Sequence, residues 1–183
     1  MGKLILTLTV VLAFNLSNAQ KVYKKYSLGN MSVVVEGTTK GEMYIDVDDV
    51  GVIMTSKDRV RFLLFLNECS DKFTKWAKVA KDNNVKELVK DINTLPLDGY
   101  FRYANEWRFG TANLRARISI VNGEAKWYIY IPKIIDDLNE YIDSEASLFF
   151  VTPTILREFN LYLDEEKINS FIISENKQED LFK

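Results

Sequence analysis

The chain has 183 residues, and its composition excludes several classes of enzyme and binding protein. It contains no histidine and one cysteine, so we expect no Ser-His-Asp or Cys-His catalytic site, no histidine-ligated metal, no thiolate zinc cluster and no internal disulfide. The formal net charge of −2 disfavours nucleic acid as a partner, because phosphate binding needs a net basic surface. No glycine-rich phosphate loop or dinucleotide fingerprint is present, and we expect no cofactor.

The first nineteen residues predict a cleavable signal peptide. Lys3 is followed by an apolar segment at residues 4–16, and Ser17 and Ala19 occupy the −3 and −1 positions of a signal-peptidase site. The apolar segment is too short to anchor the protein in a bilayer, and Gln20 stands where a lipoprotein would have cysteine. We therefore expect an exported protein, periplasmic or extracellular, with no membrane insertion after cleavage.

Residues 20–183 predict a single domain, because no repeat, low-complexity tract or linker interrupts them. Four short strands are expected first, in an antiparallel meander over residues 21–28, 31–37, 42–48 and 50–54. Gly29-Asn30 suits a two-residue type II′ turn between the first two strands. The third strand alternates, so we expect Met43, Ile45 and Val47 to face the core.

A long amphipathic helix is predicted next. Its apolar residues recur at three- and four-residue steps and form one face: Phe62, Phe65, Leu66, Cys69, Phe73, Trp76 and Ala80. Thr55 together with Asp58, or Ser56 itself, is predicted to cap the start, and Asn83-Asn84 the end. Because Cys69 lies in the middle of the apolar face, we interpret it as a core residue rather than a reactive thiol.

The second β region carries the strongest structural signal. A short amphipathic segment at residues 85–92 and a turn at Pro96 and Gly99 are expected to lead into it. Asn122-Gly123 suits a two-residue hairpin turn, which fixes the register of the strands on either side. One face then pairs Leu114 with Ile131, Ala116 with Ile129, Ile118 with Trp127 and Ile120 with Ala125. The other face pairs Arg115 with Tyr130, Arg117 with Tyr128 and Ser119 with Lys126.

The C-terminal third predicts two helices around a short strand. Apolar residues at helical spacing over residues 134–142 indicate the first helix, and residues 147–151 indicate the strand. Thr152-Pro153 predicts the start of the second helix. The pattern weakens after Asp164, and we expect a frayed tail at residues 174–183. The chain is therefore predicted to be α+β: an antiparallel β-sheet of about seven strands, with one long amphipathic helix and two C-terminal helices packed mainly on one face.

The polar face of the hairpin is the candidate binding site: Arg115, Arg117, Tyr128 and Tyr130. Guanidinium groups over tyrosine rings stabilise an exposed sheet by about 0.5–1 kcal/mol, which alone could account for the pattern. Arginine forks beside tyrosines also suit a carboxylate, a sulfate or a protein partner. We expect the partner to be a protein or an anionic small ligand. If a neighbouring strand lies alongside, the face would extend to Arg102, Tyr103, Trp107 and Arg108.

Two acidic groups could support other chemistry. Asp46, Asp48 and Asp49, with Glu42 nearby, could meet Ca²⁺, but their spacing matches no calcium loop and favours an Asp-rich turn. The remaining acids fall at polar helix positions and favour a solvated surface: Asp136, Asp137, Glu140, Glu158, Asp164, Glu165 and Glu166. We therefore predict no catalytic residue and no metal ligand.

By elimination, the sequence favours an exported, non-catalytic binding or interaction module. One alternative is a hydrolase of glycans or cell-wall material that uses two carboxylates in a cleft. Another is an inhibitor or immunity-type protein that blocks an exported enzyme. Residues 134–183 hold twelve acidic against four basic residues, and this asymmetry would steer a basic partner.

Overall fold

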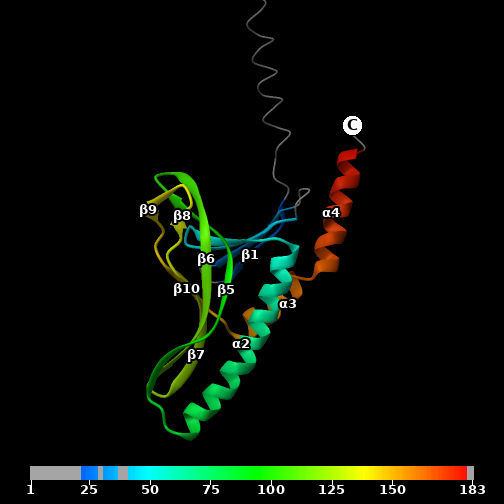
Figure 1. Ribbon diagram of the computed structural model, residues 1–183. Coiled ribbons are helices and arrows are strands. Elements are labelled where there is room, and N and C mark those ends of the chain that lie inside the picture. The colour runs from blue at the N-terminus through cyan, green and yellow to red at the C-terminus, as the bar shows by residue number, and fades with distance from the viewer. Residues whose placement is uncertain (1–21, 29–30, 37–40, 181–183) are drawn as a thin grey trace, which may run out of the picture.

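The computed structural model describes residues 22–28, 31–36 and 41–180, so the predicted signal peptide lies outside the described residues. Within them, an eight-stranded antiparallel sheet has the order β1-β2-β3-β4-β5-β6-β7-β10, and β8 pairs with β9 separately (Figure 1). The strands are β1 (Val22–Leu28), β2 (Met31–Glu36), β3 (Met43–Val47), β4 (Val50–Met54), β5 (Glu87–Tyr103), β6 (Glu106–Val121), β7 (Glu124–Ile131), β8 (Ile135–Asp136), β9 (Asn139–Asp143) and β10 (Ser147–Phe150). The helices are α2 (Ser56–Asp82), α3 (Pro153–Tyr162) and α4 (Glu165–Asp180).

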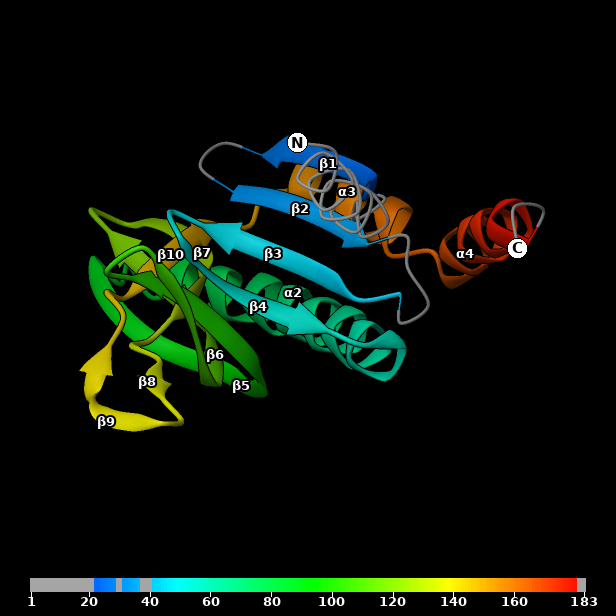
Figure 2. The ribbon, with the colours of Figure 1, turned by 90° about the horizontal axis from the view of Figure 1, so that it is seen from above.

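The predicted α+β class is confirmed, with one long helix and two C-terminal helices beside an antiparallel sheet. Helix α2 packs against β4 and β5, and α3 packs against α2 (Figures 1 and 2). The Phe62 ring of α2 meets the Phe159 ring of α3 edge-on, with 5.5 Å between the centroids. The hydrophobic core lies between these helices and the sheet. We call the opposite side of the sheet its outer face.

The N-terminal meander is confirmed by the strand register. Leu28 pairs with Met31 across the first hairpin, and β2, β3 and β4 follow as antiparallel neighbours. The predicted turn residues Gly29-Asn30 lie outside the described residues. Alternation along β3 is as expected, because its buried residues are Met43, Ile45 and Val47.

Helix α2 begins and ends where the sequence predicts. The Thr55 hydroxyl accepts a hydrogen bond from the Asp58 amide at 3.4 Å, and the Asp58 carboxylate accepts one from the Thr55 amide at 3.3 Å. Asn83 caps the other end. The predicted apolar face packs into the core, with Phe62, Phe65, Leu66, Cys69 and Ala80 buried and Phe73 and Trp76 partly buried. Arg59 is buried on the same face, which apolar periodicity does not predict.

The predicted turn at Pro96 and Gly99 is wrong, because both residues lie inside β5. This strand pairs with β6 from Glu87 to Tyr103. Pro96 is tolerated because β4 pairs only with residues 98–101 of β5, so the amide hydrogen that proline lacks is not needed for that pairing. A bulge between Asp91 and Asn93 breaks the alternation, which explains why the strand does not read as continuous in the sequence.

The helix predicted over residues 134–142 is also wrong, since this segment forms β8 and β9. The hairpin is held to β6 by a hydrogen bond of 2.9 Å from the Asp137 amide to the Phe109 carbonyl. Leu138 and Tyr141, which belong to the apparent apolar stripe, are 88% and 90% exposed. The helical spacing of a few apolar residues therefore led to a wrong prediction, because the segment is a largely exposed β-hairpin.

The two C-terminal helices are α3 and α4 instead. Thr152 caps α3, and Pro153 is its first residue, as predicted. Helix α4 continues past Asp164, where the apolar pattern weakens, and buries Ile168 completely. Among the described residues, no helix is both long and apolar enough to cross a membrane.

Candidate functional site

The hairpin of β6 and β7 has the predicted register. Asn122 and Gly123 form its turn with φ of 54° and 84°, the left-handed conformation of a type I′ turn. On the core face the pairs include Ala116 with Ile129, Ile118 with Trp127 and Ile120 with the partly buried Ala125. On the outer face the pairs are Arg115 with Tyr130, Arg117 with Tyr128 and Ser119 with Lys126. We call Arg115, Arg117, Tyr128 and Tyr130 together the Arg-Tyr face.

Arg117 contacts both a tyrosine of the Arg-Tyr face and a carboxylate of β5. Its guanidinium carbon lies 4.5 Å from the centroid of the Tyr130 ring. Its Nε donates a hydrogen bond of 2.6 Å to Oδ1 of Asp91, and this bond raises the pKa of Arg117 above its usual value. Arg115 Nη1 lies 3.8 Å from the other Asp91 oxygen. Two guanidinium groups therefore share one carboxylate, which leaves this cluster of three side chains net positive.

Asp91 is the site residue that sequence reasoning missed. It lies opposite Arg117 because β5 extends to Glu87 alongside β6. The bulge after Asp91 hides this extension, since it shifts the alternation of side chains by one residue. Only recognition of residues 85–92 as a continuation of the sheet could have placed this carboxylate beside the arginines.

Strand β10 widens the Arg-Tyr face with apolar groups. Leu148 pairs with Tyr130 and Phe150 pairs with Tyr128. The Phe150 and Tyr128 rings meet edge-on at 5.8 Å between centroids, and Phe150 is 51% exposed. The outer face therefore combines arginine, tyrosine and exposed phenylalanine, residue types that are enriched where proteins bind one another.

The predicted extension of this face lies apart from it. Trp107 is on the outer face too, where it packs against Tyr100 at 5.5 Å and Arg102 at 5.9 Å. It is eight residues from Arg115 along β6, roughly 27 Å at the usual rise of a strand. Arg108 faces the other side of the sheet and forms an ion pair of 3.5 Å with the buried Asp136 of β8. The four residues of the extension therefore form no single surface with the Arg-Tyr face.

The Asp-rich segment forms the turn between β3 and β4. Asp48 and Asp49 have φ of 55° and 64°, as a type I′ turn requires. Burial raises the pKa of Asp46, and this outweighs the hydrogen bonds that its carboxylate accepts from the Asp49 amide and the Tyr100 hydroxyl. Within the described ranges, no group of three or more Asp, Glu, Cys or His side chains is arranged to hold a metal ion.

Cys69 is a packed core residue, as predicted. Its side chain has no solvent exposure and belongs to the main hydrophobic cluster. Burial raises the pKa of the Cys69 thiol to about 12, so the thiolate is scarcely populated at neutral pH. This cysteine is therefore not a candidate nucleophile.

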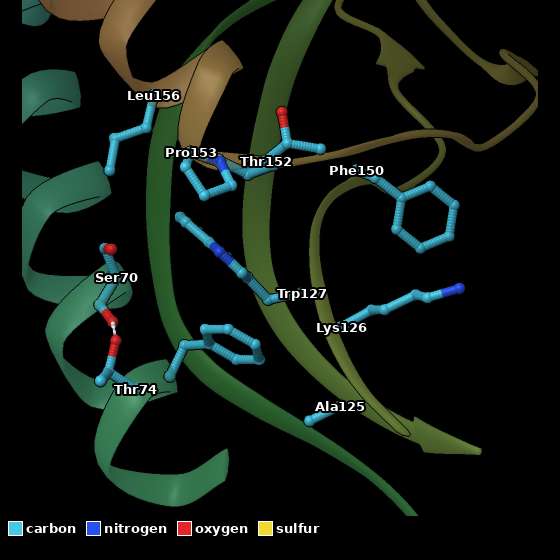
Figure 3. A pocket seen from close by; sticks show the side chains of 11 residues that line it. Ser70, Thr74, Ala125, Lys126, Trp127, Phe150, Thr152, Pro153 and Leu156 are labelled. Atoms are coloured by element: carbon cyan, nitrogen blue, oxygen red, sulfur yellow. Dashed lines mark hydrogen bonds between the residues drawn. The ribbon is translucent and has the colours of Figure 1, made fainter. Parts of the chain in front are cut away.

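Several hollows on the described surface are large enough to consider as ligand sites. One is a groove of about 530 Å³ between α2 and the start of β7, closed at one end by the start of α3 (Figure 3). A second hollow of about 440 Å³ adjoins it and shares Lys126 and Phe150. A third, of about 210 Å³, is lined by acidic residues Asp58 and Asp98 together with Arg61.

Two carboxylates, those of Asp58 and Asp98, line the third hollow, which makes it the candidate for a paired-carboxylate hydrolase site. The Asp58 carboxylate already accepts hydrogen bonds from Thr55 and from Arg61, the latter at 2.8 Å. Burial raises the pKa of Asp58, but the bonds from Thr55 and Arg61 outweigh it and hold that pKa below its usual value. Asp58 is thus engaged in the capping box of α2 and is a poor general acid.

The chain matches no protein-family model, no curated protein and no solved structure.

Proposed function

We propose that this protein is a non-catalytic binding module, exported through the signal in residues 1–19, and that its Arg-Tyr face contacts the partner. The observation that carries the proposal is the pairing of two partly exposed arginines with tyrosines on the outer face of the sheet. Rigid tyrosines and arginine forks supply most of the energy in many protein interfaces. A protein or anionic ligand with a carboxylate is the partner that this chemistry suits.

The charge balance of the Arg-Tyr face supports an acidic partner. Asp91 is shared between Arg115 and Arg117, so it orients both guanidinium groups without neutralising both. Phe150 and Leu148 add apolar surface beside them. An acidic side chain flanked by apolar groups would thus meet complementary charge and surface.

A carboxylate-based hydrolase is less well supported than a binding module. It would need two carboxylates that converge in a cleft, one of them able to give up a proton. The third hollow contains two acids, Asp58 and Asp98, but the Asp58 carboxylate is engaged in the capping box of α2. The binding proposal requires no such group.

Native mass spectrometry on the protein recovered from its own cells tests export and binding together. We expect a mass that begins at Gln20, plus the mass of a bound partner. A mass that includes Met1 would refute export, and a bare monomer would count against a stable partner.

The contact surface is tested with an Arg115→Ala/Arg117→Ala double variant and the purified partner. We expect its affinity to fall at least about tenfold, because two arginines of this kind contribute at the level of interface hot spots. Arg102→Ala/Arg157→Ala removes the same charge at exposed positions elsewhere and serves as the control. Full affinity in the first double variant would show that the partner binds another surface.

A further inference from the structure

The groove between α2 and β7 exists because β10 is shorter than β7. Strand β10 pairs with residues 128–131 of β7 and leaves it after Val151, whose amide donates to the Trp127 carbonyl at 3.1 Å. Ala125, Lys126 and Trp127 then line the groove as consecutive residues. Since consecutive strand residues point to opposite faces, the groove follows the strand edge and opens toward both faces. In Figure 3, Ser70 and Thr74 of α2 lie on one side of it and Phe150 on the other.

The walls of the groove are mainly apolar. Phe73 of α2 and Trp127 of β7 stack with 6.1 Å between centroids and 28° between their planes. The apolar lining residues are Phe73, Ala125, Trp127, Phe150, Val151, Pro153 and Leu156. The volume of about 530 Å³ falls within the range typical of small-molecule sites, roughly 300–1,000 Å³. This lining suits an apolar chain rather than a polar metabolite.

The described residues that line the groove carry a net positive charge. Lys126 is the one charged side chain among the described residues that line it. Helix α3 begins beside the groove, with Thr152 as its N-cap. The first turn of α3 contains no acidic residue. The positive end of the helix dipole is thus not offset locally, and it adds to the charge of Lys126. Glu124 lines the adjoining hollow but not the groove.

We propose that the groove binds a single-chain amphiphile with a carboxylate head, of the fatty-acid class. The apolar chain lies between Phe73, Trp127 and Leu156, and the carboxylate lies at Lys126. The groove contains none of the four residues of the Arg-Tyr face, although it shares Phe150 with the apolar surface beside that face. The proposal stands whether or not the Arg-Tyr face binds a protein.

Calorimetric titration with dodecanoate, below its micelle threshold, tests the proposal on the full mature chain. Wild-type protein should bind one dodecanoate, and Lys126→Glu should weaken binding by about tenfold or more, because a charge-assisted contact becomes a repulsion. Lys75→Glu makes the same charge change on an exposed part of α2 outside the groove and should leave the affinity unchanged. Dodecyltrimethylammonium, which has the same chain and the opposite charge, should bind wild type more weakly than dodecanoate does.

Two further measurements locate the ligand. Thr74→Trp should fill the groove from α2 and abolish binding, whereas Lys126→Glu keeps the groove open. In NMR spectra, dodecanoate should shift the indole N–H of Trp127 and leave that of Trp107, on the outer face, in place. Absence of binding to wild type, or equal affinities for wild type and Lys126→Glu, would overturn the proposal. So would a dimer in sedimentation that Thr74→Trp dissociates, because a second copy would then occupy the groove.

Discussion

The guanidinium of Arg59 in α2 and the carboxylate of Glu165 in α4 form a two-point contact across the helix pair. Nε of Arg59 lies 2.5 Å from Oε1 of Glu165, and Nη2 lies 2.9 Å from Oε2. Nη1 donates to the Gly41 carbonyl just before β3. Arg59 is 1% exposed, so its charge depends on these partners. One side chain thus connects the long helix, the last helix and the start of a strand.

Replacing Glu165 by Ala should destabilise the protein strongly. Removing one partner of a buried ion pair costs about 3–5 kcal/mol, because the other charge stays buried without a partner. Glu165 is partly exposed, so we expect the lower end of that range. Urea denaturation followed by far-UV circular dichroism measures the loss.

The Arg157–Glu158 pair on the surface of α3 supplies the control. Its Arg157 side chain is largely exposed, and Arg157→Ala should change the free energy of unfolding by about 0.5 kcal/mol or less. A double variant, Arg59→Met/Glu165→Met, should lose much less than the sum of the two single losses. Equal losses for Glu165→Ala and Arg157→Ala would mean that the Arg59 contact contributes little.

Local signals were sufficient to predict much of the sheet. The turn at Asn122-Gly123 acts on its immediate neighbours, so the pairing of Arg117 with Tyr128 could be predicted from spacing alone. The cap formed by Thr55 and Asp58 is equally local. These features depend on residues close together in the chain, which is why they were predictable.

Contacts between distant segments could not be predicted in this way. Glu165 and Asp136 occupy polar positions of apparent helices and were expected to be solvated, yet Asp136 is buried and Glu165 holds Arg59 from 106 residues away. Asp91 joins the Arg-Tyr face only because a bulge shifts β5 by one residue. In each case the decisive partner lies on a segment whose position depends on the whole fold.

Cys69 should resist alkylation in the native protein. Its thiol is fully buried, and burial raises its pKa to about 12, so both access and thiolate formation are suppressed. Iodoacetamide at pH 8 should modify the protein only as fast as it unfolds, and urea should accelerate the reaction. Mass spectrometry of intact protein over time checks this. Rapid modification without denaturant would contradict the buried position of Cys69.

The Thr55 cap should contribute to the stability of the protein. Thr55→Ala removes the hydroxyl that accepts from the Asp58 amide and should cost about 1 kcal/mol. Thr154→Ala, within the first turn of α3, is an exposed control and should cost much less. Thermal unfolding at pH 7 compares the two variants, and equal losses would show that Thr55 is not acting as a cap.

The contribution of Asp58 follows from the direction of its shift in pKa. Its folded pKa lies below the unfolded value of about 3.9, so its charge stabilises the fold above that value. The contribution is lost as pH falls through the folded pKa. Wild type should therefore exceed Asp58→Asn in stability at pH 7, and the difference should shrink below about pH 4. A difference that is constant from pH 7 to pH 3 would exclude Asp58 as the titrating group.

The β8–β9 hairpin should detach when Gly110 gains a side chain. A Cβ atom at Gly110 would lie 2.0 Å from the Ile135 carbonyl oxygen and 3.0 Å from Cγ2 of Ile134. The nearest atom belongs to the backbone, so β8 itself must move, and we expect Gly110→Ala to cost about 1–3 kcal/mol. Hydrogen exchange of the Asp137 amide, which donates to Phe109, should accelerate because that bond holds the hairpin to β6.

Thr111→Ala is the matched control for Gly110→Ala, since Thr111 is the next residue of β6 and lies exposed on the outer face. It should leave the exchange rate of Asp137 unchanged. Amides of the β6–β7 hairpin, such as that of Ile118, should stay protected in both variants, because their pairing does not involve β8. If Gly110→Ala left Asp137 as protected as in wild type, the close approach of β8 to Gly110 would not be what holds the hairpin.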